Sequence, residues 1–398
     1  MGKRKAKATA AMPADAHLGL LHGAQNQFGA EGVYASELIN ERHVGLPLQS
    51  LALEYLFGSD KLILGKSYGI AGPPESFKSA LLLDFMRHIC SFTGSGWLVE
   101  TEGEKISAPM LKSTCGEMAK RILMRPVTSV DAAQESLTWI IEWMKKEKPS
   151  RDFLIAVGLD SLSGAATEER GEQIAKDGSA KRDYSSEALL WTKWLKTYAS
   201  KLAGWPMAMI YVNHEKQKMD GRTGHEKSKP SGIAQDFYAT VYLSIRRIKD
   251  QRGSEQTLTQ LRLRSEKNSF GEHKRSIDTL FVYDHSGPLA RMHFDWNHAT
   301  AEMLSQQKAA VKDLIEVTPS TENMTALTRS FNCRQLGLKA VSGQDVGLAV
   351  QSNPELMVEL RKRLGINDYK EWVGAMPIPE STVQDPEVAC EDDEPLES

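Results

Sequence analysis

Short apolar runs alternate with amphipathic stretches along the middle of this chain, from about residue 46 to residue 292. Four of the runs have the length of buried strands, and the stretches between them have helical spacing. The expected strands are 67–71, 96–100, 153–159 and 207–212, and the expected helices are 79–92, 106–119, 131–147 and 184–203. This alternation predicts an α/β fold with a mainly parallel sheet that is covered on both faces.

The pattern changes after about residue 235. Three further strands are expected at 238–247, 258–265 and 278–284, and their short polar turns predict an antiparallel extension of the sheet. Residues 299–376 have mostly helical spacing. We therefore expect a basic N-terminal arm over 1–45, a core over 46–292, a small, mostly helical C-terminal domain over 293–379 and a tail over 380–398.

Composition describes an ordinary globular protein, with 398 residues of which 41% are hydrophobic and 25% charged. No apolar run approaches the ~20 residues that cross a bilayer. The basic N-terminus is not followed by an apolar signal segment. Four scattered cysteines indicate neither a zinc site nor a disulfide framework. We expect a cytoplasmic protein with no membrane partner.

Charge is distributed unevenly along the chain. Residues 380–398 contain eight acidic residues and no Lys or Arg, although the whole chain has a net charge of only −3. The remainder is therefore mildly basic, which suits a protein that binds a polyanion. A tail that only keeps the protein soluble is the alternative that charge alone leaves open.

Residues 72–80 have the pattern of a phosphate-binding loop between a strand and a helix. The segment reads Gly72-Pro73-Pro74-Glu75-Ser76-Phe77-Lys78-Ser79-Ala80. In such a loop backbone N–H groups surround the phosphates, a lysine here numbered Lys78 neutralises them, and the Ser79 hydroxyl reaches Mg²⁺. Phe77 stands where the consensus has glycine. The pattern predicts binding of ATP and Mg²⁺.

Three polar residues follow the ends of the other expected parallel strands. Glu102 is suited to orient the water that attacks the γ-phosphate, Asp160 to hold Mg²⁺, and His214 to sense the γ-phosphate. Each has an ordinary alternative: a solvated acidic turn, a chance aspartate, or a loop or core histidine. Their order and strand spacing, taken with the phosphate-binding loop, favour nucleotide hydrolysis.

Two long polar segments, 163–183 and 214–235, each follow an expected strand. Both are basic enough to contact the phosphate backbone of a single DNA strand, and an apolar side chain such as Met219 is suited to insert between the bases. The candidate DNA-binding residues are Arg170, Lys176, Lys181, Arg182, Lys216, Lys218, Met219, Arg222, Lys227 and Lys229. Because acidic residues also occur in these segments, an ordinary solvated loop is the alternative.

Several stretches between about residues 25 and 285 resemble the RecA-type recombinases, and most closely the UvsX-like branch of tailed bacteriophages. They are Asn26-Gln27-Phe28-Gly29, Gly45-Leu46-Pro47-Leu48, the segment 237–248 and Lys267-Asn268. The Ser-Phe-Lys-Ser sequence around Phe77 is also similar to that branch.

The resemblance implies a RecA-like P-loop ATPase core, with ATP bound between the protomers of a helical filament on single-stranded DNA. It implies homologous pairing with double-stranded DNA and strand exchange, in recombination, repair and recombination-dependent replication. Lys78, Glu102 and His214 match catalytic positions of the family, although His214 stands where RecA has glutamine. Lys267 matches a residue that reaches the ATP of the neighbouring subunit. Single-strand-binding and mediator proteins are implied partners, and the host cytoplasm is the location if the gene is viral.

Two other functions remain open at this point. A ring-shaped helicase or translocase shares the phosphate-binding loop and the strand-end glutamate, but no arginine finger segment is recognisable. A non-catalytic, ATP-binding scaffold would be expected to lack Lys78 or Glu102, and both are present.

Overall fold

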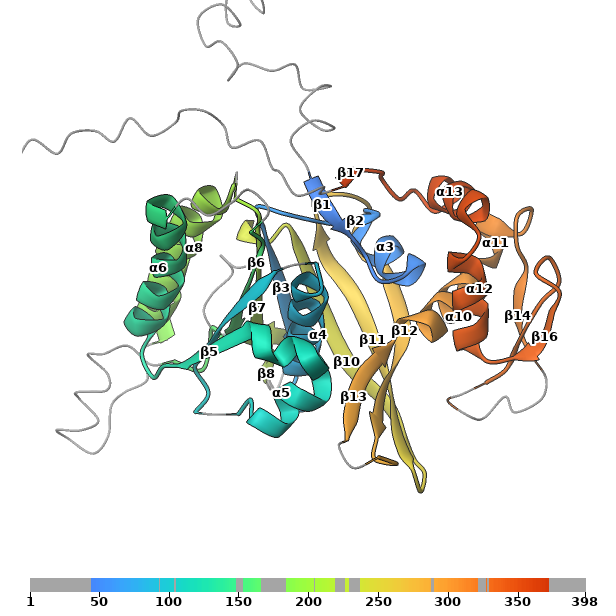
Figure 1. The fold of residues 1–398 in the computed structure, drawn as a ribbon, viewed down its shortest axis with the longest axis horizontal. Helices are drawn as coiled ribbons and strands as arrows, with labels where there is room; N and C mark the ends of the chain where they lie inside the picture. The colour runs from blue at the N-terminus through green and yellow to red at the C-terminus, as the bar shows by residue number, and fades with distance from the viewer. Residues whose placement is uncertain are drawn as a thin grey trace, which may run out of the picture.

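The computed structural model describes residues 44–92, 94–103, 105–147, 153–165, 184–203, 205–218, 226–228, 237–287, 290–320, 327 and 329–371. A nine-stranded sheet with the order β13-β12-β11-β10-β3-β7-β6-β4-β5 forms its centre (Figure 1). The strands are β3 (Lys66–Gly72), β4 (Ser95–Glu100), β5 (Ile122–Pro126), β6 (Ile155–Asp160), β7 (Met207–His214), β10 (Val241–Arg252), β11 (Gln256–Asn268), β12 (Ser276–Asp284) and β13 (Arg291–Asp295). From β10 to β5 neighbouring strands are parallel, whereas β11, β12 and β13 continue the sheet antiparallel.

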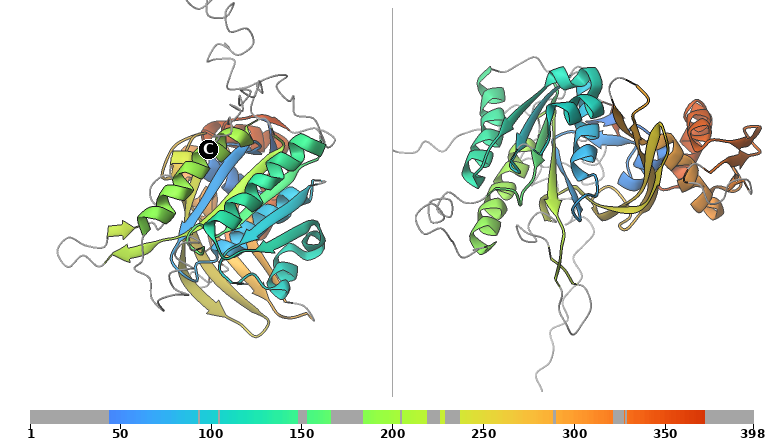
Figure 2. Two further views of the ribbon diagram at one scale, coloured as in Figure 1. Left: turned by 90° about the vertical axis from the view of Figure 1, so that its left-hand side faces the viewer. Right: turned by 90° about the horizontal axis from the view of Figure 1, so that it is seen from below.

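Helices cover both faces of the parallel part. Side chains of β7 alternate between two hydrophobic clusters because successive strand residues point to opposite faces. Ile210 packs on the face that carries α4 (Lys78–Cys90), whereas Tyr211 packs on the face that carries α6 (Val130–Glu147) and α8 (Tyr184–Leu202). The left view of Figure 2 shows α6 and α8 side by side across that second face. This double burial explains why the strands read as continuous apolar runs.

Smaller elements surround the main sheet. A second sheet has the order β17-β1-β2, and a two-stranded hairpin, β8–β9, extends from the end of β7 (Figure 2). These elements and the helices near them are β1 (Val44–Pro47), α3 (Leu51–Phe57), β2 (Lys61–Ile63), α5 (Ala108–Cys115), the 3₁₀ helix η2 (Gly116–Arg121), β8 (Lys216–Lys218), β9 (Glu226–Ser228) and β17 (Lys370–Glu371).

In its described residues, the C-terminal part combines four helices with a three-stranded sheet of order β14-β15-β16. Its elements are α10 (Trp296–Gln306), α11 (Lys308–Val311), β14 (Val317–Pro319), β15 (Phe331–Cys333), β16 (Leu338–Val341), α12 (Gly343–Gln351) and α13 (Pro354–Arg363). Trp296 and Leu304 of α10 belong to the same hydrophobic cluster as α4 and the main sheet. The bidentate pair of Arg361 with Glu54, at 2.7 Å for both bonds, also joins α13 to α3.

Most of the expected architecture is confirmed. The mixed α/β fold, the seven predicted strands and the four predicted helices are present with shifted ends, and α5 stops early and continues as η2. Strand β5 was not predicted, because at this sheet edge only its first residue, Ile122, is buried and no period of two arises. The mostly helical expectation for the C-terminal part missed β14–β16, whose strands are too short to show a pattern.

The arm up to residue 43 and the acidic tail lie outside the described residues. Within the described ranges, every helix is too short or too polar to cross a bilayer.

Candidate functional site

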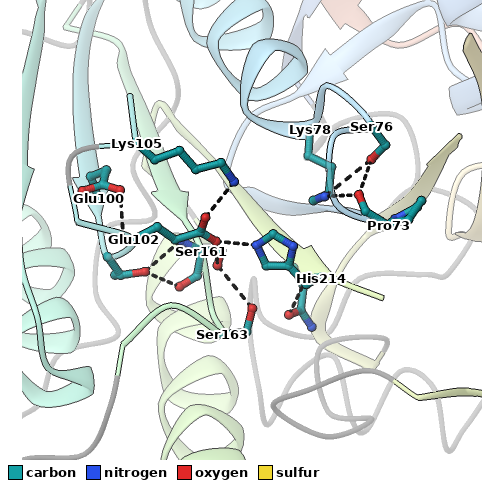
Figure 3. Close-up of polar contacts among 11 residues, drawn as sticks. Pro73, Ser76, Lys78, Glu100, Glu102, Lys105, Ser161, Ser163 and His214 are labelled. Atoms are coloured by element: carbon teal, nitrogen blue, oxygen red, sulfur yellow. Dashed lines mark hydrogen bonds and ion pairs between the residues drawn. The ribbon is translucent and has the colours of Figure 1, made fainter. Parts of the chain in front are cut away.

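The four predicted site segments meet at one edge of the main sheet, where β3, β4, β6 and β7 end. In the parallel register Gly72 lies opposite His214, and Glu100 lies opposite Asp160. Parallel strands deliver their carboxyl ends to a common edge, which is where ligands bind in open α/β sheets. Figure 3 shows the resulting arrangement, with the phosphate-binding loop facing the group around Glu102 and the His214 imidazole between them.

The phosphate-binding loop is closed by contacts of its own polar groups. Lys78 Nζ donates to the Pro73 carbonyl oxygen at 2.6 Å, and the Ser76 hydroxyl donates to the same oxygen at 2.8 Å (Figure 3). The N-cap residue of α4, Phe77, makes no side-chain hydrogen bond to the first turn of this helix, which begins at Lys78. Its first N–H groups are therefore left for an anion, as in other helix N-termini that bind phosphate.

Lys78 lies in an environment that disfavours its charge. The pKa of Lys78 is lowered to about 8, chiefly by burial and also by the nearby Lys105 ammonium, while the carboxylates of Asp160 and Glu102 partly oppose this. A bound triphosphate would place negative charge beside Lys78 and so stabilise its ammonium form. The electrostatics of Lys78 are therefore those of a residue prepared to meet an anion.

Phe77 adopts the backbone conformation that glycine usually supplies in this loop. Its φ is +65°, and Glu75 nearby has a φ of +58°. The Phe77 ring is half-buried and packs on the ring of Phe281 in β12, with 4.4 Å between the centroids. The missing consensus glycine has therefore not prevented the expected turn.

Glu102 is the centre of a hydrogen-bond network. Its carboxylate accepts from Lys105 Nζ at 2.7 Å and from the Ser161 hydroxyl at 2.5 Å, and it contacts the His214 ring nitrogen Nε2 (Figure 3). Burial alone would raise the pKa of Glu102, but the bonds from His214, Lys105 and Ser161 outweigh it and hold the pKa well below its usual range. Glu102 therefore stays ionised, as an acceptor for a water proton must.

Asp160, at the end of β6, is completely buried, and its peptide bond to Ser161 is cis. The pKa of Asp160 is raised to about 6, chiefly by burial and also by the Glu102 carboxylate, and the nearby Ser79 hydroxyl and Lys105 ammonium only partly oppose this. Among the described residues, none forms a hydrogen bond of ordinary geometry with either carboxylate oxygen. Two orphaned, buried carboxylate oxygens next to a serine hydroxyl fit a hydrated Mg²⁺, a hard cation that prefers oxygen ligands.

The end of β7 connects this site to the β8–β9 hairpin. The residue after His214, Glu215, donates its backbone N–H to the Gly72 carbonyl oxygen at 2.9 Å. The hairpin begins at Lys216, which lies opposite Ser228 in the register. The base of the predicted second DNA-binding segment is thus bonded directly to the first residue of the phosphate-binding loop.

Of the candidate DNA-binding residues, only Lys216, Lys218 and Lys227 fall in described segments, as backbone positions of β8 and β9. The other seven lie outside the described residues: Arg170, Lys176, Lys181, Arg182, Met219, Arg222 and Lys229. Lys267, predicted to reach a neighbouring subunit, donates within its own chain to the Phe237 carbonyl oxygen at 2.6 Å.

The sequence did not point to Lys105 or Phe281. Lys105 follows Glu102 by three residues, and that spacing is visible in the sequence, but the turn that brings the two charges together is not. Phe281 is an ordinary strand residue by pattern, and only the sheet order brings it to Phe77.

Comparison with known proteins finds RecA proteins at low sequence identity. No protein-family profile matches the chain. The chain is 22% identical to the RecA protein of Lactobacillus delbrueckii subsp. bulgaricus over 357 residues, which are 85% of this chain and 90% of that protein. Identity is 25% to RecA of Thermus thermophilus over 228 residues, and 23% to RecA of Mycoplasma mobile over 199 residues. These two matches span 63% and 56% of the relatives' lengths. Similarity to RecA proteins at this low identity supports a RecA-type family for the chain.

Proposed function

We propose that this protein is an ATP-dependent DNA strand-exchange recombinase of the UvsX-like branch, which forms helical filaments on single-stranded DNA. One observation carries the ATPase part. The uncapped start of α4, the ionised Glu102 and the orphaned Asp160 carboxylate converge on one sheet edge. There the helix N–H groups would bind a triphosphate, Asp160 would hold its Mg²⁺, and Glu102 would face the attacking water.

Each residue has a role in the proposed hydrolysis. Lys78 and the first N–H groups of α4 bind the phosphates, and Ser79 with Asp160 would hold Mg²⁺. The metal would draw charge from the phosphate oxygens. Glu102 orients the attacking water and accepts its proton, the water oxygen bonds to the γ-phosphorus, and the bond from that phosphorus to the β,γ-bridging oxygen breaks to release ADP and phosphate. Lys105 and Ser161 keep the Glu102 carboxylate ionised and in place.

Contacts at the end of β7 support the coupling of hydrolysis to DNA. His214 contacts Glu102, and the adjacent Glu215 bonds to Gly72 of the phosphate-binding loop. A nucleotide that moves either group therefore also moves the strand that leads into β8–β9. In this proposal ATP orders the hairpin on single-stranded DNA, and hydrolysis releases it.

A strand-exchange assay tests the proposal. The protein, circular single-stranded DNA and homologous linear duplex should give joint molecules with ATP and none without nucleotide. Lys78→Ala should abolish the product, and Lys112→Ala, a change of the same kind away from the loop, should not. Electron microscopy with a slowly hydrolysed ATP analogue should show filaments. Closed hexamers without joint molecules would instead favour a helicase.

A further inference from the structure

A series of aromatic ring contacts leads from the phosphate-binding loop into the main hydrophobic core. The Phe77 ring packs on Phe281 of β12, and Phe281 meets Phe294 of β13 with 5.1 Å between centroids. Phe294 stacks on Trp296 of α10 at 5.1 Å, with ring planes 11° apart. The Trp296 indole N–H then donates to Asp84 of α4 at 2.9 Å. This series of contacts starts at Phe77, the residue before α4, and returns to α4 at Asp84, about two helical turns later.

We propose that Phe77 is a positioning residue for the nucleotide. Its ring, held by Phe281, fixes the turn that presents Lys78 and the start of α4 to the phosphates. This inference rests on the proposed ATP site. It adds to that site a residue that positions the loop and takes no part in the reaction. The backbone of Phe77 is left-handed, and its side chain does not cap the helix. Ring packing is therefore the contact through which the Phe77 side chain acts on the loop.

The residues that anchor Phe77 are buried, whereas part of the phosphate-binding loop is exposed. Phe281, Phe294 and Trp296 are 2%, 5% and 6% exposed and belong to the main hydrophobic cluster. By contrast, Pro73, Pro74 and Glu75 of the loop are exposed. Asp84 is itself a residue of α4 and also accepts from Arg87 of the same helix at 2.6 Å, so Trp296 bonds to a carboxylate that is held in place within α4. Removing the Phe77 ring would release the turn without disturbing the anchor.

Phe77→Gly separates ring packing from backbone conformation. Glycine adopts a φ near +65° at least as readily as phenylalanine, so a loss of nucleotide affinity cannot come from a backbone conformation that the new residue is unable to adopt. We expect the Kd for mant-ATP with Mg²⁺ to rise roughly tenfold, the factor that an aromatic pair of this kind contributes. The KM for ATP should rise in parallel, while kcat at saturating ATP stays within about twofold.

Phe281→Leu provides the matching change on the anchor and leaves the loop sequence intact. It should weaken binding as Phe77→Gly does, and the double variant should bind no more weakly than the single variants, because both remove one contact. Phe153→Leu is the control: Phe153 pairs with Trp143 on the opposite face of the sheet, at 5.7 Å. It should lower the melting temperature and leave the Kd unchanged.

Two outcomes overturn the inference: unchanged or tighter mant-ATP binding by Phe77→Gly, or fully additive losses in the double variant. Failure of the unsubstituted chain to bind mant-ATP is a different result. It would overturn the proposed function itself, and this inference with it.

Discussion

Replacing Asp160 with Asn should stabilise the metal-free protein, although it removes a residue of the candidate site. The pKa of Asp160 is raised by burial to about 6 from an ordinary 3.8. Two units of difference correspond to about 3 kcal/mol of lost stability once the carboxylate is ionised in both the folded and the unfolded chain. Asparagine has the same shape and no charge, so the variant avoids up to this loss of folding stability.

The pH dependence gives this prediction its sign. An acid with a raised pKa binds its proton more tightly in the folded chain, so stability falls as pH rises from about 4 through about 6. The advantage of Asp160→Asn should therefore approach 3 kcal/mol at about pH 7.5 and be about half as large at about pH 5. Comparing the two proteins at the same pH cancels the titration of groups that do not interact with Asp160.

Urea denaturation with a chelator, at both pH values, measures the two differences. Addition of ATP and Mg²⁺ should then stabilise the wild type and not the variant, because a ligand stabilises only a folded state that binds it. The reasoning is refuted if metal-free Asp160→Asn is no more stable than wild type at the higher pH, or if its advantage is the same at both.

Three further expectations concern turnover and DNA. Glu102→Gln should keep ATP affinity and lower kcat roughly 10²- to 10⁴-fold, the usual contribution of a general base, and near-normal hydrolysis would remove Glu102 from that role. Exchanging Lys216 and Lys218 for Ala should weaken binding to single-stranded DNA and flatten its salt dependence by up to about 1.4 in log–log slope. An unchanged slope, measured by fluorescence anisotropy, would put the DNA site elsewhere. Deleting 380–398, with its eight acids, should strengthen DNA binding most at low salt. Equal affinity at low and moderate salt would reduce this tail to a solubility device.

Hydrophobic period was enough to predict the strands that are buried on both faces. Runs such as 207–212 are apolar at every position because α4 packs on one side and α6 with α8 on the other. The hydrophobic pattern does not identify strands that bury few residues or that are very short. Strand β5 buries only Ile122, and β15 has three residues, so tertiary contacts rather than local pattern determine both.

The candidate site was predictable to the same extent as the sheet. Once the strands were identified, the strand-end rule brought Glu102, Asp160 and His214 to one edge, and the structure has them there. Contacts that depend on turn geometry were not predictable, and Lys105 is the example. The environment of Asp160 was not predictable either. Whether a buried carboxylate finds a hydrogen-bond partner depends on all the residues packed around it, and these come from distant parts of the sequence.

Helix α10 has a consequence for how the protein unfolds. Its buried face belongs to the cluster that also contains α4 and β12, so the C-terminal part has no separate core at this junction. Opening α10 would expose the helix that carries the phosphate-binding loop, and the two regions should lose structure in one cooperative step. By the same linkage, a nucleotide at Lys78 would slow hydrogen exchange in α10, far along the chain from the atoms it touches.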